Sequence, residues 1–137
     1  MKPPIGYSGT PLAKKLGIKE ASRLLLLDAP AGFLQLMQPL PSAVQFDDGL
    51  SQAIDIVHVF ATQNATLKKR LTMIRNGLRS DAAVWVSWPK KASRVATDIT
   101  EDTIREVALP MGFVDIKVCA IDTVWSGLKL VVRKELR

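Results

Sequence analysis

The chain has very few of the residues that cross-link small proteins or bind metals in them. Its 137 residues include one cysteine, Cys119, and one histidine, His58. A lone cysteine cannot form an internal disulfide, and it cannot complete a cysteine zinc site. We therefore expect stability to come from a hydrophobic core, which a chain of this length is large enough to form. We also expect a reducing, cytoplasmic location.

Long hydrophobic runs are missing as well. No stretch approaches the ~20 apolar residues that a transmembrane helix needs. The longest candidates, residues 24–27 and 54–61, have the length of β-strands. Residues 1–7 contain no apolar segment of the kind found in secretory signals, and residues 1–9 are predicted to be irregular because they are rich in proline and glycine. We expect no membrane association.

Acidic residues are scarce in two segments of the chain. Residues 1–19 and 62–94 carry many lysines and arginines but only one acid, Asp81, and the net charge is +6. Such a balance favours anionic partners, namely nucleic acids, small phosphate-bearing ligands or acidic protein surfaces. The same charges can also be the solvated face of a helix, above all in the segment Lys68–Arg70.

Short apolar segments alternate with amphipathic ones along the whole chain. Apolar segments without polar alternation are typical of strands buried on both faces, and Thr10, Asn64 and Thr100 are suitable N-caps for helices. The last two strands are joined by too few residues for a parallel crossover, so they should pair antiparallel. The predicted strands are 22–28, 44–46, 54–61, 82–88, 113–121 and 128–133, and the predicted helices are 10–16, 31–38, 64–78 and 100–111.

This alternation predicts a single α/β domain over residues 1–137. Helices should cover both faces of a mostly parallel, Rossmann-like sheet, which gives three layers closed by a C-terminal antiparallel hairpin. Such a sheet resembles the S-adenosylmethionine-dependent methyltransferase fold, shortened by one strand–helix unit near Asp48–Ala53. The resemblance implies the strand order 2-1-3-4-6-5, with the last strand antiparallel to the others.

The methyltransferase resemblance also implies a glycine-rich loop after the first strand and an acid after the second. Here the loop is Asp28-Ala-Pro-Ala-Gly32, with one glycine and with Pro30, which has no N–H and a fixed φ. Asp47 or Asp48 could hold the ribose hydroxyls of the cofactor. Because the loop departs from the family pattern, we predict no cofactor and no tight binding of S-adenosylmethionine.

A second resemblance covers nearly the whole chain. The segments Tyr7–Ile18, Trp88–Ser93, Ala96–Glu101 and Trp125–Leu128 are similar to a family of small uncharacterised bacterial proteins, a domain of unknown function. This resemblance implies no biochemical activity.

The strongest candidate site follows the fourth predicted strand. Pro89 cannot donate to a sheet ladder, so it should end that strand and place Lys90 and Lys91 at the carboxyl edge of the sheet. Lysines and hydroxyls are groups that hold a phosphate or a carboxylate. The alternative is that Trp88 packs under the loop and the lysines stay hydrated. The predicted ligand-binding residues are Ser87, Trp88, Lys90, Lys91, Ser93 and Arg94, with Asp28 and Gly32 after the first strand.

Other chemistry is sparse. We predict that His58, inside an apolar strand, is buried and has no catalytic partner, and that Cys119 behaves as a small hydrophobic residue. No catalytic or metal-binding residue is predicted. The predicted interface residues are Tyr7, Lys14, Lys15, Trp125 and Ser126, of which the last two are expected in a hairpin loop.

Three functional hypotheses follow. The first is a non-catalytic, methyltransferase-like domain that binds an anionic ligand or an acidic protein partner. The second is a methyltransferase with a degenerate cofactor loop, and the third is a nucleic-acid-binding module. The third rests on charge alone, because no known nucleic-acid-binding motif is present. Whether the protein is an enzyme, which ligand it binds and its oligomeric state stay open.

Overall fold

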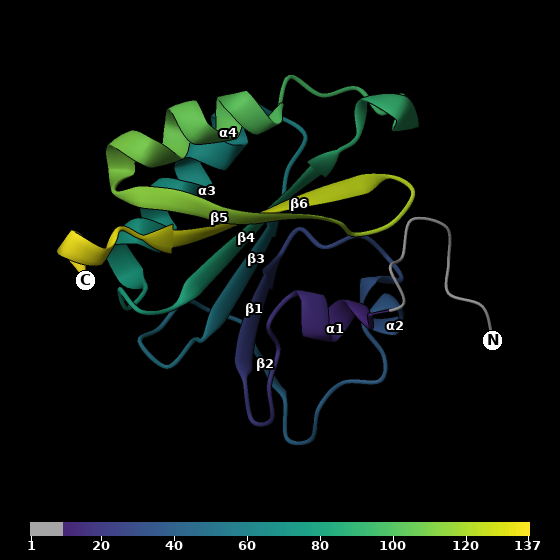
Figure 1. The fold of residues 1–137 in the computed structure, drawn as a ribbon, viewed down its shortest axis with the longest axis vertical. Coiled ribbons are helices and arrows are strands. Elements are labelled where there is room, and N and C mark those ends of the chain that lie inside the picture. Colours follow the sequence, from purple (N-terminus) through teal and green to yellow (C-terminus); the bar gives the residue numbers. More distant parts are fainter. Residues whose placement is uncertain (1–9) are drawn as a thin grey trace.

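The computed structural model describes residues 10–137, so the predictions for the N-terminal segment and for Tyr7 lie outside the described residues. Figure 1 shows one sheet with helices on both faces. The strands are β1 (Arg23–Leu27), β2 (Gln45–Asp47), β3 (Ile56–Phe60), β4 (Ala83–Pro89), β5 (Phe113–Ala120) and β6 (Trp125–Val132). The helices are α1 (Leu12–Lys15), α2 (Phe33–Leu36), α3 (Asn64–Gly77) and α4 (Glu101–Ala108), with 3-10 turns η1 (Lys91–Ser93), η2 (Leu109–Met111) and η3 (Lys134–Leu136).

The sheet has the order β2-β1-β3-β4-β6-β5, which confirms the predicted topology. The strands β2, β1, β3 and β4 pair in parallel, and β6 runs antiparallel to both of its neighbours. Because β5 is antiparallel to β6, it points the same way as the parallel strands. The carboxyl ends of β1, β3, β4 and β5 therefore meet at one edge of the sheet.

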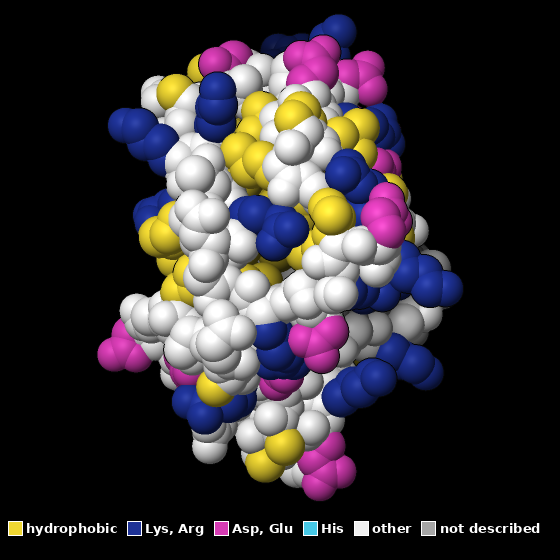
Figure 2. Space-filling view, turned by 90° about the vertical axis from the view of Figure 1, so that its left-hand side faces the viewer, with side chains coloured by type: hydrophobic (Ala, Val, Ile, Leu, Met, Phe, Trp, Pro, Cys, Tyr) yellow, Lys and Arg dark blue, Asp and Glu magenta, His cyan; other side chains and the backbone are white. Residues whose placement is uncertain are grey.

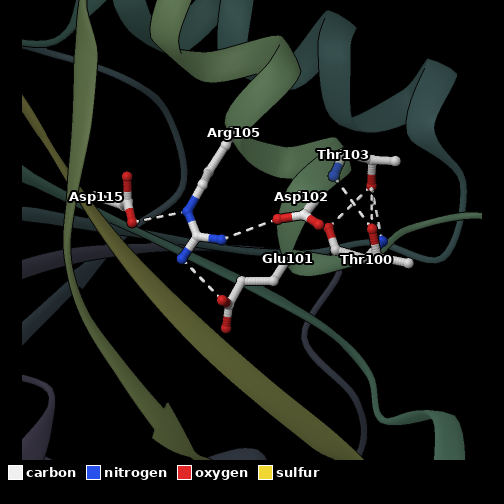
Figure 3. Close-up of polar contacts among 6 residues, drawn as sticks. All are labelled: Thr100, Glu101, Asp102, Thr103, Arg105 and Asp115. Atoms are coloured by element: carbon white, nitrogen blue, oxygen red, sulfur yellow. Dashed lines mark hydrogen bonds and ion pairs between the residues drawn. The ribbon is translucent and has the colours of Figure 1, made fainter.

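One face of the sheet is covered by α3 and α4 (Figure 1). Leu67, Leu71 and Ile74 of α3 recur at helical spacing and are fully buried. Thr100 caps α4 as expected, because its hydroxyl accepts from the Thr103 N–H and the Thr103 hydroxyl accepts from the Thr100 N–H (Figure 3). The core on this face is mainly aliphatic.

Arg105 fastens α4 to β5 (Figure 3). Its guanidinium donates to Asp115 of β5 at 2.9 Å, to Glu101 at 2.7 Å and to Asp102 at 3.1 Å. The hydrogen bonds that Arg105 donates to Asp115 and Glu101 raise its pKa further above the usual range. This face thus joins helix and strand by ion pairs as well as by apolar packing.

The other face is covered by the two short helices α1 and α2, and its core is aromatic. His58 stacks on Phe60 with ring centroids 4.4 Å apart, and Phe33 of α2 meets both rings edge-on. Trp85 is fully buried, and its indole Nε1–H donates to the Leu16 carbonyl at 3.0 Å. The short helices therefore depend on the sheet for their position.

Several local expectations were wrong. Pro11, not Thr10, is the N-cap of α1, and no side chain caps that helix. Gln63 precedes α3 as its N-cap, so Asn64 is the first helical residue and does not cap by its side chain. β2 is largely exposed, as an edge strand can be. Trp125 and Ser126 belong to β6, because the hairpin turn is shorter than predicted.

Residues 48–55 join β2 to β3 without a helix, at the place where the sequence indicated a missing strand–helix unit. Among residues 10–137, none of the helices is long and apolar enough to cross a membrane.

Candidate anion-binding site

The carboxyl edge of the sheet carries two shallow hollows on either side of Trp125. One, of about 260 Å³, is lined by residues that include Asp28, Thr62 and Trp125. The other, of about 300 Å³, lies between the Pro30–Phe33 segment and Trp125. Ligands of open α/β sheets bind at this edge, where the strand order reverses.

The loop after β4 is held in one shape by its own hydrogen bonds. The Lys90 N–H donates to the Val124 carbonyl at 2.7 Å, which ties the loop to the hairpin. The Ser93 hydroxyl donates to the Lys90 carbonyl at 2.6 Å and accepts from the Val95 N–H. Arg94 closes the turn in the left-handed region with φ 62°. The Ser93 hydroxyl is therefore engaged in shaping the loop.

No acid of the described chain forms an ion pair with the cations of this loop. Every ion pair between two of residues 10–137 has arginine as its cation, and none includes Lys90, Lys91 or Arg94. The nearest acids along the chain have other partners, because Asp98 accepts from the Asn64 N–H and Glu101 binds Arg105. Three cations thus extend from one ordered loop with their charge uncompensated among the described residues.

Ser87 does not belong to this surface, and the prediction that it binds the ligand needs correction. Its side chain is fully buried, and its Oγ lies 2.6 Å from Nε2 of His58. Trp88 is also buried and packs in the core beneath the loop. In a strand that is buried on both faces, the sequence does not show which side chains reach the rim.

The His58–Ser87 pair is a buried polar contact inside the aromatic core. His58 is 2% exposed, as predicted, and burial lowers the pKa of its ring to about 3. The ring is therefore neutral at ordinary pH, and its Nε2 either accepts a hydrogen bond from the Ser87 hydroxyl or donates one to it, depending on the tautomer. Because both groups are shut away from solvent, this pair has no access to a substrate.

Two of the acids at the positions that the methyltransferase resemblance singled out, Asp47 and Asp28, have protein partners here, whereas Asp48 is exposed. Asp47 accepts from Nη2 of Arg23 at 2.9 Å and from Nε of the same residue at 3.3 Å. Asp28 accepts from Arg70 at 3.0 Å. Gly32 has φ 89°, and a Cβ there would meet nothing within 4 Å. Glycine is thus favoured at this position by its backbone conformation, not by a close approach of other atoms.

The predicted interface residues separate into two places. Trp125 meets Phe60 edge-on at 5.2 Å and covers the end of the aromatic core, and Ser126 pairs with Trp88 in the sheet. Lys14 and Lys15 lie on α1, where they face Lys117 of β5 across a groove. Sequence reasoning missed Lys117, because nothing in the sequence brings it close to α1.

Basic side chains do not form one stripe on the face shown in Figure 2, where lysines and arginines are scattered among acids and apolar side chains. A continuous stripe would have favoured nucleic acid. The face in that view gives no support to the nucleic-acid hypothesis.

Comparisons with known proteins show similarity of fold. The chain is similar to a SAM-dependent methyltransferase from Aquifex aeolicus, with a TM-score of 0.63, 13% identity and coverage of 88% of this chain and 87% of that one. Aeropyrum pernix fibrillarin, solved with natively bound S-adenosyl-L-methionine, gives a TM-score of 0.56 at 14% identity, covering 92% of this chain and 70% of that one. The Bacillus subtilis M1A22 tRNA methyltransferase TrmK gives 0.53 at 11% identity, covering 93% and 67%.

Comparisons at the level of sequence give no match. No family model and no curated protein matches the chain. The resemblance to the family of small uncharacterised bacterial proteins therefore stays a prediction. The solved structures show that the fold is that of the S-adenosylmethionine-dependent methyltransferases.

Proposed function

We propose that this protein is a non-catalytic, methyltransferase-like domain that binds an anionic ligand through the loop Lys90–Arg94. The observation that carries the proposal is the uncompensated charge of Lys90, Lys91 and Arg94 at the carboxyl edge of the sheet. Lysine ammonium groups can make charge-assisted hydrogen bonds to phosphate oxygens, and the preformed backbone of the loop needs no ordering when a ligand binds.

The proposal excludes methyl transfer because the residues fit the methyl-donor cofactor poorly. Of the two acids after β2, Asp47 is bound twice by Arg23 whereas Asp48 is exposed, and Asp28 after β1 is bound by Arg70. The loop after β1 has a single glycine, Gly32, and has Pro30 where the backbone would need to approach the cofactor closely. The observation that favours the alternative, a methyltransferase with a degenerate loop, is the pair of hollows at the edge where the fold's ligands bind.

A thermal-shift screen tests the proposal. Nucleotides, other phosphorylated metabolites and S-adenosylmethionine are added separately, and a true ligand at 100 times its Kd should stabilise the protein by about 2.7 kcal/mol. We expect a shift with a phosphate-bearing compound, none with S-adenosylmethionine, and a binding affinity that falls as salt rises. Micromolar binding of S-adenosylmethionine in calorimetry would instead contradict this expectation and favour the methyltransferase alternative.

The variant Lys90→Ala/Lys91→Ala locates the site. Since these ammonium groups form no ion pair with a described residue, the unliganded melting temperature should hardly change. The shift with the anion should disappear. If the double variant unfolds, or if it keeps the full shift, the loop is not the binding site.

A further inference from the structure

A groove lies between α1 and the edge strand β5, away from the loop Lys90–Arg94 in sequence. Its volume is about 510 Å³, which is in the range of small-molecule sites. One wall is formed by Thr10, Lys14 and Lys15, and the other by residues 117–120 of β5. Nζ of Lys117 donates to the Lys15 carbonyl at 2.9 Å, so a hydrogen bond joins the two walls.

The described residues that line the groove include lysines and no acid. Lys14 and Lys117 form no ion pair with another of residues 10–137, where the cation of each ion pair is an arginine. Phosphate binding by lysine needs no bidentate geometry, because an ammonium group acts as a compact point charge. The groove thus presents positive charges on flexible side chains to an anion.

The lysines continue beyond the groove onto β6. Lys117 lies directly opposite Lys129 in the antiparallel pair β5–β6. Like charges at opposed positions destabilise a sheet. Burial, together with the charges of Lys117 and Lys19, lowers the pKa of Lys129. The fold therefore keeps a local cluster of like charge that costs stability, and such exceptions are expected at functional sites.

We propose that this groove is a second anion site, which binds a small ligand carrying a diphosphate. Adjacent phosphates supply several oxygens, so that one diphosphate can accept from ammonium groups on both walls. The volume of the open groove, about 510 Å³, is in the range of sites for one small molecule. The inference does not depend on the function proposed for the loop Lys90–Arg94.

Cys119 provides a direct reporter of occupancy. It is the one cysteine of the chain, it is partly exposed, and it lines the groove beside Lys117. Its alkylation by iodoacetamide is measured with increasing inorganic pyrophosphate at constant ionic strength. We expect saturable protection of about fivefold or more, and none with sulfate. Alkylation that pyrophosphate does not slow would overturn the proposal.

Charge-matched variants assign the protection to the groove. Lys14→Gln/Lys117→Gln keeps hydrogen-bonding groups and should abolish protection. Lys68→Gln/Lys69→Gln on α3 removes the same charge from an exposed surface elsewhere and should keep it. Each variant is compared with and without pyrophosphate, because loss of Lys117 itself changes the thiol's reactivity. If pyrophosphate protects Cys119 equally in the groove variant and in the α3 variant, the overall charge of the protein attracts the anion and the groove does not bind it specifically.

Two more measurements distinguish binding in this groove from binding at the loop and from binding of nucleic acid. Pyrophosphate should still protect Cys119 in the variant Lys90→Ala/Lys91→Ala. If this variant loses the protection, the anion binds at the loop Lys90–Arg94 instead. A single-stranded oligonucleotide that protects Cys119 at lower concentration than pyrophosphate would contradict a small-molecule site. Failure at the loop and failure at the groove are therefore distinguishable.

Discussion

The two faces of the sheet are stabilised in different ways. On one face, α3 and α4 are regular helices whose apolar residues follow helical spacing, and α4 has its own capping box. On the other, α1 and α2 are single turns without side-chain caps, held over an aromatic core by contacts from β3 and β4. The first face is specified by local sequence, whereas the second depends on contacts between residues far apart in the chain.

Removing Trp85 should have the largest effect on stability, and it should disrupt the face of the sheet that α1 and α2 cover. Trp85→Ala deletes a fully buried ring and leaves the Leu16 carbonyl without its donor. We expect a loss of about 3–5 kcal/mol in the free energy of unfolding, measured in urea. Hydrogen exchange should show that the amides of α1 lose protection.

Leu71→Ala is the matched control on the other face, since Leu71 is also fully buried. It should lower the free energy of unfolding by about 2–5 kcal/mol. The amides of α1 should then lose only as much protection from hydrogen exchange as the lower global stability explains. Equal effects of both variants on α1 would contradict the distinction between the faces.

Acid should weaken the aromatic face through His58. Its pKa is about 3 in the folded protein against an ordinary value of 6.5, so protonation favours the unfolded chain. The neutral ring's contribution is complete above pH 6.5 and is lost as the pH falls from 6.5 toward 3. At pH 5 we expect a loss of about 2 kcal/mol relative to pH 7.

The control for His58 is His58→Phe combined with Ser87→Ala, which removes the titrating ring and its polar partner together. Urea titrations at both pH values should show that the difference between pH 7 and pH 5 shrinks by the amount assigned to His58. An unchanged difference would mean that other groups cause the acid sensitivity.

The smallest expected effect is the difference between substitutions at the N-termini of α4 and α1. Thr100→Ala removes the cap of α4 and should cost about 1 kcal/mol. Thr10→Ala should leave stability within about 0.5 kcal/mol, because Thr10 is not the N-cap of α1. Thermal unfolding of both variants measures the contrast, and a comparable loss at Thr10 would show that α1 is capped in solution.

The strands themselves and the antiparallel pairing of the last two were predictable because their signals are local, whereas the strand order followed from the resemblance to the methyltransferase fold. Uninterrupted apolar segments marked the parallel strands, and the short link between the last two strands required an antiparallel pair. Helical spacing in the same way identified Leu67, Leu71 and Ile74 as the buried side of α3. Patterns of this kind need no knowledge of distant contacts.

The candidate sites were less predictable because they depend on orientation and on pairing across the fold. Lys90 and Lys91 followed from the end of a strand, but the side chain of Ser87 turned inward to His58. Lys117 contacts α1 only because β5 lies at the edge of the sheet beside it. No local pattern signals a contact between residues so far apart.

The link between β2 and β3 has a consequence for engineering. It stands where a complete fold of this type would carry another unit, and Asp48 and Gly49 within it are exposed. Each doubling of a flexible loop costs only about 0.6 kcal/mol. A peptide epitope or a small reporter domain inserted between Asp48 and Gly49 should therefore be accommodated, which makes this turn a permissive position for tagging the protein without touching either proposed site.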